Sequence, residues 1–267
     1  MVDIGLIVPP DQPPERFIAA ARAAEDAGLD EVWLWEDCFA ESGVGAAAAL
    51  LASTSRVRVG IGLLPVPLRN VALTAMEVAT LDRLYPGRLL PGFGHGILPW
   101  MGQAGARVRS PLTLLREHIT ALRALLAGES VTVDGTYVTL SDVQLRWPPR
   151  QPPPLLIGAE GPKTLQLAGE YGDGVILIRD YAEGAEQARA AHRASGRTGD
   201  LDVTTFLTVP VGAGHDELAE AIQECVAAGA TRVPVVGAVD AGQQPDGSEA
   251  IMALAQRLGE VRSRLRA

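Results

Sequence analysis

The chain has only two cysteines, Cys38 and Cys225, which lie far apart in unrelated contexts. Neither has a partner at metal-binding spacing, so we interpret both as free thiols and expect neither a disulfide framework nor a metal site. The chain also lacks a run of about 18 apolar residues, which argues against a membrane span. Residues 1–8 have no basic group before their apolar run and no cleavage-like motif, so they predict a first strand and a cytoplasmic protein.

Positive charge is scarce. The 267 residues contain 23 lysines and arginines against 32 acidic residues, and the net charge of −9 argues against nucleic acid or an anionic membrane as a partner. Lysine occurs once, at Lys163, and aromatic residues make up only 4% of the chain. With 47% hydrophobic residues the chain can still bury a sizeable core, and its length fits one (β/α)8 barrel or two small domains.

Apolar segments of strand length alternate with segments of helical periodicity, and short breaks with proline or glycine separate them. The expected strands are residues 3–9, 31–36, 57–64, 88–94, 155–159, 174–178, 201–209 and 231–236. The expected helices are residues 13–27, 45–52, 71–84, 110–127, 161–171, 183–195, 216–228 and 249–264. Eight such units in this length favour a parallel sheet closed into a (β/α)8 TIM barrel over an open sheet, in a single domain over residues 1–267.

One segment does not fit the alternation. Residues 131–140 carry alternating β-branched residues around Asp134 and Gly135, which indicates a β-hairpin. A proline-rich stretch, residues 147–154, follows it. We therefore expect residues 131–153 to form a hairpin and proline-rich insertion outside the barrel, before the fifth strand.

A glycine-rich stretch ends the fourth expected strand. Residues 88–96 read Arg-Leu-Leu-Pro-Gly-Phe-Gly-His-Gly, with a single histidine, His95. Alternate glycines leave one face of an extended segment without side chains, so a flat ligand or another backbone can approach closely. We interpret the stretch as a strand end that forms the floor of a cofactor site, with an irregular tight loop as the alternative. His95 then points the other way or lies where the strand stops.

Two carboxylates, Glu36 and Asp37, follow Trp35 where the second expected strand ends. Barrel enzymes carry their chemistry at the carboxyl ends of the strands, so both are candidates for acid/base chemistry. Capping of the next helix is the alternative for one of them. The third strand carries Gly60 and Gly62, which indicate a bulge, a close ligand approach or barrel-corner packing.

A further cluster follows the fifth expected strand, where residues 157–164 read Ile-Gly-Ala-Glu-Gly-Pro-Lys-Thr. A strand, a glycine-containing turn and a helix start leave free backbone N–H groups at the positive end of a helix dipole, which suits an anion. The only lysine, Lys163, lies in that first turn. Gly161 and Pro162 also punctuate ordinary helices, so this alternative stays open.

Other chemistries have no apparatus in the sequence. It contains no Gly-x-Ser-x-Gly or Walker motif and no histidine, cysteine and carboxylate cluster with zinc spacing. His118, His192 and His215 fall on expected helices or in loops away from the strand ends. We interpret these three histidines as surface or packing residues.

Four segments make the chain resemble the bacterial luciferase-like superfamily, especially its branch that uses the deazaflavin coenzyme F420. They are residues 24–35, 81–96, 110–129 and 158–177, spread over the first two thirds of the chain. The second and fourth are the most specific, because a glycine–arginine strand start and a Gly-Pro-Lys turn fall in the family's order and spacing. The resemblance implies a (β/α)8 barrel with an inserted region, a cofactor bound at its carboxyl end, and a homodimer.

The resemblance also implies a strand bulge behind the cofactor ring, often with a non-prolyl cis peptide, here within residues 62–64. The bond between Leu64 and Pro65 is a less costly cis candidate. The implied cofactor contacts are Gly62, Leu63, Leu64, Gly94, His95, Gly158, Ala159, Glu160, Gly161, Pro162, Lys163 and Thr164, with residues 161–164 holding the phosphate. The implied acid/base candidates are Asp37, Glu36 and His95, in descending order; the histidine that relatives often carry after the second strand is missing.

Together these features predict an oxidoreductase that transfers a hydride between coenzyme F420 and a small organic substrate. Arg107 and Arg109 are candidates to bind the acidic tail of the coenzyme. One alternative is an FMN-dependent luciferase-like monooxygenase that uses reduced flavin and O₂. Another is a barrel that binds a flavin without catalysis. A barrel isomerase or aldolase would need a Schiff-base lysine at a strand end, and Lys163 lies at a helix start instead.

Overall fold

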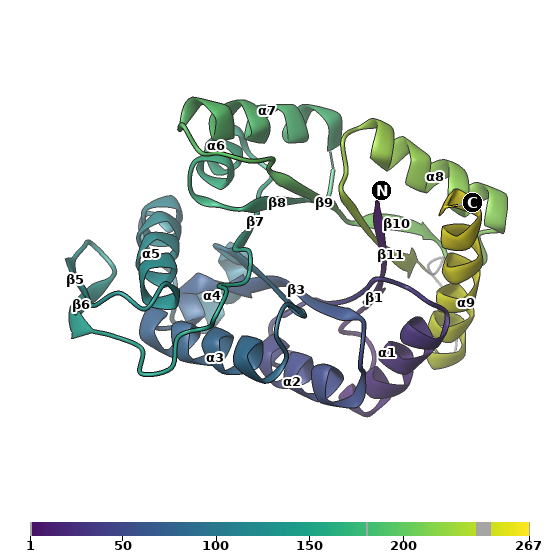
Figure 1. Ribbon diagram of the computed structural model, residues 1–267, viewed down its shortest axis with the longest axis horizontal. Helices are drawn as coiled ribbons and strands as arrows, with labels where there is room; N and C mark the ends of the chain where they lie inside the picture. Colours follow the sequence, from purple (N-terminus) through teal and green to yellow (C-terminus); the bar gives the residue numbers. More distant parts are fainter. Residues whose placement is uncertain (1, 180, 239–246, 267) are drawn as a thin grey trace.

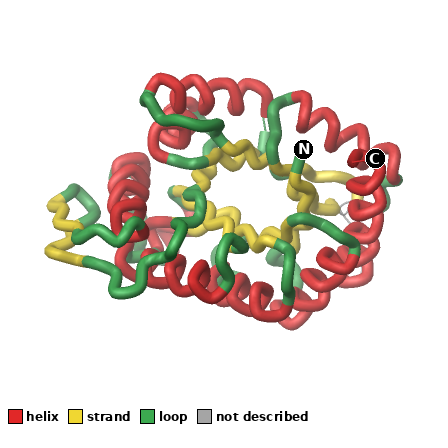
Figure 2. The backbone as a smooth tube through the Cα atoms, viewed as in Figure 1, coloured by secondary structure: helices red, strands yellow, loops and turns green. Residues whose placement is uncertain are grey.

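Parallel strands close into a ring because the first strand, β1, pairs with β2 on one side and with β11 on the other. The structure is a computed structural model that describes residues 2–179, 181–238 and 247–266. Within these residues the strands follow the order β1-β2-β3-β4-β7-β8-β9-β11, with β10 also beside β11. The strands form a central ring that the helices surround (Figure 1, Figure 2). The predicted (β/α)8 barrel is confirmed.

The elements lie close to the ranges expected from the sequence. The barrel strands are β1 (Asp3–Val8), β2 (Glu31–Leu34), β3 (Arg58–Pro65), β4 (Leu89–Gly94), β7 (Leu156–Gly158), β8 (Gly174–Leu177), β9 (Asp202–Thr205), β10 (Leu207–Pro210) and β11 (Arg232–Ala238). The helices are α1 (Phe17–Asp26), α2 (Gly43–Ser53), α3 (Val71–Leu84), α4 (Leu98–Gln103), α5 (Pro111–Leu126), α6 (Pro162–Tyr171), α7 (Tyr181–Ala194), α8 (His215–Ala227) and α9 (Gly247–Arg266), with 3-10 turns η1 (Pro14–Arg16) and η2 (Val66–Leu68).

Side chains on alternate strand positions fill two separate apolar layers. Outward-facing residues such as Val32 and Phe93 pack against the helices. Inward-facing residues such as Ile7, Trp33 and Ile176 fill the barrel interior. Because both faces are covered, every residue of β2, β4 and β8 is buried, as expected for a parallel sheet.

An ionic layer closes the amino-terminal end of the barrel. Buried Glu31 accepts a hydrogen bond of 2.7 Å from the Trp33 indole and forms ion pairs with Arg232 and, at 2.8 Å, with Arg58. Arg232 also lies 3.0 Å from a carboxylate oxygen of Asp202. Since these side chains satisfy one another at the start of the strands, the space for a ligand is at the opposite, carboxyl end.

The expected strand over residues 201–209 is broken at Phe206, between β9 and β10. Phe206 donates its N–H to the carbonyl of Leu177 at 2.9 Å, and this is the last hydrogen bond of the β8–β9 ladder. Its ring turns into the barrel, with its centroid 5.3 Å from that of Trp33 and 6.0 Å from that of Trp35. The break therefore places an aromatic ring inside the barrel, beneath the carboxyl end.

The predicted hairpin is confirmed. Strands β5 (Val131–Asp134) and β6 (Thr139–Val143) pair antiparallel in a separate sheet that projects beyond α5 (Figure 1). Glu117 of α5 accepts hydrogen bonds from the N–H groups of residues 136–138 in the turn. Burial alone would raise the pKa of Glu117, but these three bonds outweigh it and lower the pKa, which ties the hairpin to the helix.

Candidate functional site

A cavity of about 750 Å³ opens at the carboxyl ends of the barrel strands. Its wall comes from the ends of β2, β3, β4, β7 and β8 and from the break that contains Phe206. Most of the site residues expected from the sequence meet there. They are Glu36, Asp37, Gly62, Leu63, His95, Gly158, Ala159, Glu160, Gly161 and Thr164. Four others, Leu64, Gly94, Pro162 and Lys163, are not part of the wall.

A bulge in β3 forms one part of the wall. The pairing between β3 and β4 shifts register between Ile61 and Leu64, and the peptide bond between Gly62 and Leu63 is cis. The predicted bulge with a non-prolyl cis peptide is confirmed. In the described part of the chain the other cis bond joins Cys38 and Phe39, so the bond before Pro65 is trans. Leu63 faces the cavity, whereas Leu64 is buried between barrel and helices.

Three glycines near the bulge make room for neighbouring protein atoms. A Cβ on Gly92 would lie 2.5 Å from the backbone oxygen of Ile61. A Cβ on Gly94 would lie 2.5 Å from Leu63 Cδ2, and one on Gly158 would lie 2.4 Å from the same atom. Gly92 therefore admits another backbone, one of the two uses expected from the sequence. Gly94 and Gly158 form the seat of the Leu63 side chain.

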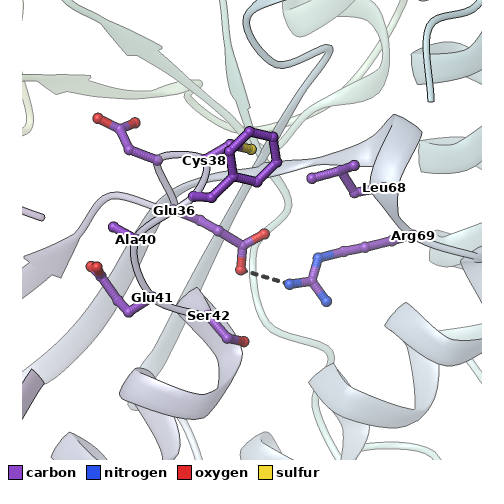
Figure 3. A pocket seen from close by; sticks show the side chains of 9 residues that line it. Glu36, Cys38, Ala40, Glu41, Ser42, Leu68 and Arg69 are labelled. Carbon is purple, nitrogen blue, oxygen red and sulfur yellow. Dashed lines mark hydrogen bonds and ion pairs between the residues drawn. The ribbon is translucent and has the colours of Figure 1, made fainter. Parts of the chain in front are cut away.

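Two protein partners hold the side chain of Glu36. Its Oε2 accepts a hydrogen bond of 2.6 Å from the N–H of Gly43, in the first turn of α2. The same oxygen lies 2.6 Å from Arg69 Nη2 (Figure 3). The other end of that guanidinium binds Glu77 at 2.9 Å. The alternative reading from the sequence, that one carboxylate caps the next helix, therefore applies to Glu36.

Asp37 is the unengaged carboxylate of the pair. Its side chain has no hydrogen bond or ion pair to the residues that the structure describes. It lies on the wall of the main cavity and also on that of a smaller pocket of about 340 Å³. Burial raises the pKa of Asp37, and burial together with the charges of Glu36 and Asp37 raises the pKa of the Cys38 thiol. Asp37 is thus free to exchange a proton with a ligand.

His95 directly follows β4 and lines the cavity, at the point where the strand stops. Its Nδ1 lies 3.0 Å from the carbonyl oxygen of Gly96. Because a carbonyl only accepts, Nδ1 carries the hydrogen in this bond. Nε2 is then available to a ligand, since it has no partner in the described part of the chain.

The turn between β7 and α6 contributes most of the expected anion site. Gly161 is the N-cap of α6, makes no side-chain cap and has open space where a Cβ would lie. The N–H groups of Gly161 and Lys163 donate to no carbonyl in the described residues, as usual in the first turn of a helix. Thr164 lines the cavity beside them. Glu160 forms an ion pair with Arg179 at the edge of this turn.

The Lys163 side chain faces a different part of the surface. It lines a groove of about 190 Å³ between α5 and α6. Lys163, Gln166 and Glu170 are spaced by three and four residues and share that outer face of α6, whereas Thr164 and Ala168 are buried on the inner face. Lys163 could therefore contact a phosphate through its backbone N–H at the start of α6. Its ammonium group lies in the groove instead.

Several wall residues were not assigned to the site from the sequence. They are Pro65, Gly96, Ile97, Leu98, Pro99, Trp100, Ile176, Ile178 and Phe206. The short helix α4 carries three of them, and its apolar sequence directly after a barrel strand was a usable signal. Ile97, Leu98 and Ile178 are exposed although they are large and apolar.

No group of three or more His, Cys, Asp or Glu side chains in the described residues is placed to hold a metal ion. No described helix combines the length and apolarity needed to cross a membrane. His118 and His192 are buried packing residues, and His215 pairs with Glu260 at the surface.

Comparison with known proteins places these features in context. The profile of the luciferase-like monooxygenase family matches residues 3–265. An F420-dependent glucose-6-phosphate dehydrogenase of Beutenbergia cavernae is 34% identical over 258 residues, covering 85% of this chain and 73% of the relative. A 5,10-methylenetetrahydromethanopterin reductase of Methanolobus tindarius is 30% identical over 207 residues, covering 76% of this chain. This chain spans only 63% of that second relative.

The fold also matches a solved structure. An F420-dependent secondary alcohol dehydrogenase in complex with an F420–acetone adduct superposes with a TM-score of 0.85 at 20% identity. The match covers 97% of this chain and 98% of the dehydrogenase. At this identity the likeness concerns the barrel itself.

Proposed function

The chain belongs to the luciferase-like monooxygenase family, and on this premise we propose that it is an oxidoreductase that transfers a hydride between coenzyme F420 and a small organic substrate. Both relatives described above act on small molecules, and the name of the dehydrogenase includes F420. When bound, the deazaflavin supplies a ring carbon that gives or accepts the hydride. The protein supplies orientation, an apolar environment and a proton-exchanging group.

The residues of the cavity fit such a coenzyme. The wall beside the β3 bulge is apolar, with Leu63, Ile176 and Phe206 around it, which suits a flat aromatic ring. The uncapped start of α6 offers the N–H groups of Gly161 and Lys163 to a phosphate. Both features open on the same cavity. We propose that residues 161–164 hold the phosphate and that the bulge supports the ring.

Each polar side chain then has a distinct role. We assign proton exchange with the substrate to Asp37, because it is unengaged and burial raises its pKa. Glu36 is a positioning residue, since its carboxylate is bound to Gly43 and Arg69 and fixes the end of β2. His95 offers Nε2 to the coenzyme or the substrate.

One observation carries the proposal: the cis bulge of β3, the open start of α6 and the free carboxylate of Asp37 share one cavity of about 750 Å³. A titration tests it. Purified protein is titrated with F420 and, separately, with FMN, following the absorbance of each ring. The expected outcome is that F420 binds more tightly than FMN. A labelled hydride should also be exchanged between reduced F420 and the substrate.

The family also supports a second function, an FMN-dependent monooxygenase that uses reduced flavin and O₂. Tighter binding of FMN, with O₂ consumption on addition of reduced FMN, would favour it. Tight binding of either coenzyme without hydride exchange or O₂ consumption would favour a non-catalytic flavin-binding barrel. The titration together with the hydride-exchange and O₂-consumption assays therefore separates all three.

We also propose that the protein is a homodimer that works in the cytoplasm as one domain of residues 1–267. The exposed apolar residues Leu73, Met76 and Leu84 of α3 support a subunit contact on that helix. Sedimentation velocity should give a dimer for the wild type and a monomer for Met76→Glu. Cell fractionation tests the location.

A further inference from the structure

The cavity wall carries negative charge and no guanidinium or ammonium group. Glu36, Asp37 and Glu160 line it, and no lysine or arginine does so among the residues that the structure describes. The remaining residues, 1, 180, 239–246 and 267, contain no lysine or arginine in their sequence. No lysine or arginine from outside the described residues can therefore add a cation to the wall.

Three cations on elements next to the cavity are engaged elsewhere. Arg69, on the wall of the smaller pocket, binds both Glu36 and Glu77. Arg179 pairs with Glu160 at the edge of the α6 turn. Lys163 lies in the groove between α5 and α6. None of these three groups is free to receive an anion beside Asp37.

The anion-binding part and the carboxylate part of the cavity lie on different strands. The uncapped start of α6 follows β7, whereas Glu36 and Asp37 follow β2, and strands β3 and β4 stand between them in the ring. With the coenzyme phosphate at α6, the cavity wall beside Asp37 offers no lysine or arginine side chain, among the described residues, to a second phosphate or a carboxylate. Desolvation of an anion there would go uncompensated.

The rim of the same cavity is apolar. Ile97 and Leu98 at the start of α4 are 50% and 41% exposed, and Ile178 after β8 is 50% exposed. Trp35 and Trp100 add aromatic surface to the wall. Apolar side chains left in water around a cavity mouth indicate that an apolar ligand covers them.

We propose that the substrate bound beside Asp37 is an uncharged, largely apolar organic molecule, and that the site rejects phosphate esters and carboxylates. This proposal rests on the proposed function for the identity of the coenzyme. The charge and apolarity of the wall are observed independently of the proposed function. Selection occurs by mismatch: an anion beside Asp37 meets its unpaired carboxylate and apolar side chains, and no free cation compensates the charge.

The test compares two ligands that differ in one charged group. The neutral probe is 1-phenylethanol, and the anionic probe is 4-(1-hydroxyethyl)benzoate. Binding is followed through tryptophan fluorescence excited at the red edge, because Trp35 and Trp100 line the cavity. The readout needs no coenzyme. We expect the neutral probe to bind at least tenfold more tightly.

Two arginine variants at the rim are compared with one control variant outside the cavity wall. Leu98→Arg places a cation at the rim and should reduce the preference to less than threefold, as should Ile178→Arg. Val226→Arg changes a side chain of α8 that is also 41% exposed but lies outside the cavity wall, and it should leave the preference unchanged. Equal or tighter binding of the benzoate to the wild type overturns the proposal, and so does binding of neither probe.

A parallel titration with F420 separates this proposal from the previous one. If F420 fails to bind while the preference for the neutral probe holds, the proposed function fails and the substrate class stands. If F420 binds and the preference is absent, only the substrate class fails.

Discussion

Arg69 Nη2 lies 2.6 Å from Glu36 Oε2, and this ion pair joins the segment after β2 to the turn between η2 and α3. Both side chains are largely buried, with 12% and 9% of their surface exposed. Because Asp37 is the next residue, the pair fixes the backbone that carries the proposed proton-exchanging group. The pair thus connects the stability of the barrel rim to the geometry of the site.

Replacing Arg69 by methionine should lower the free energy of unfolding by about 2–4 kcal/mol, because it leaves the Glu36 carboxylate buried without its cation. Urea unfolding followed by far-UV circular dichroism measures this. Arg193→Met is the matched control, since Arg193 and Glu186 form a pair that is 63% and 69% exposed. It should cost less than about 0.5 kcal/mol. Equal losses in both variants would contradict a structural role for the Arg69–Glu36 pair.

Replacing Asp37 by asparagine should lower kcat/KM at least about 10²-fold while the affinity for F420 stays within about twofold. Burial raises the pKa of Asp37 in the folded protein, so its carboxyl takes up a proton at a higher pH than an ordinary aspartate does. In the direction of substrate oxidation the carboxylate is the active form. Activity should therefore fall as the pH drops through this raised pKa.

The pH profile of kcat/KM distinguishes this role from a structural one. The wild type should show the acidic limb, and Asp37→Asn should lose it while keeping its residual activity. Glu36→Gln should keep the limb, because Glu36 acts through its contacts with Gly43 and Arg69. A limb that persists in Asp37→Asn would assign proton exchange to another group.

Replacing Gly161 by aspartate should weaken F420 binding at least tenfold without loss of thermal stability. Aspartate at an N-cap accepts hydrogen bonds from the first N–H groups of a helix, so it stabilises α6 while it occupies the proposed phosphate donors. Open space surrounds Gly161, and its φ of −92° suits any residue. Equilibrium dialysis and thermal unfolding measure the two effects.

Lys163→Ala is the companion variant. Because its side chain lies in the groove between α5 and α6, we expect the affinity for F420 to change less than about threefold. A large loss in Lys163→Ala together with none in Gly161→Asp would place the phosphate on the ammonium instead of on the start of the helix.

The sequence predicted the barrel and its insertion because these depend on local patterns. Strand and helix periodicities alternate along the chain, and β-branched residues flank Asp134 and Gly135 in the hairpin. The direction of the Lys163 side chain was not predicted, since it depends on how α6 is rotated about its axis. The spacing of the apolar residues Leu165 and Ala168 indicated that rotation, because they lie on the face toward the barrel.

Other features depend on contacts between distant residues. Gly94 and Gly158 leave the room that the Leu63 side chain occupies, and the Phe206 ring at the break packs against the Trp33 ring. No local pattern reports which side chain will fill a space opened by a glycine many residues away. The same holds for the two carboxylates after β2, whose division of roles depends on Arg69 from the next strand–helix unit.

His118 should make the protein less stable in mild acid. It is buried on α5 with both ring nitrogens unpartnered among the described residues, and its ring centroid lies 6.3 Å from that of Phe93. Burial, with a smaller effect from the charge of Arg69, lowers the pKa of His118 from 6.5 to about 4. The unfolded chain therefore binds more protons than the folded one between about pH 6.5 and 4, so stability falls as the pH falls through this range.

Between pH 7 and pH 5, this histidine should remove about 2 kcal/mol from the free energy of unfolding. His118→Phe keeps a planar ring without a titratable group. Its loss of unfolding free energy between pH 7 and pH 5 should therefore be about 2 kcal/mol smaller than that of the wild type. Urea unfolding at a series of pH values gives the difference. Parallel pH curves for wild type and His118→Phe would show that the buried ring does not resist protonation.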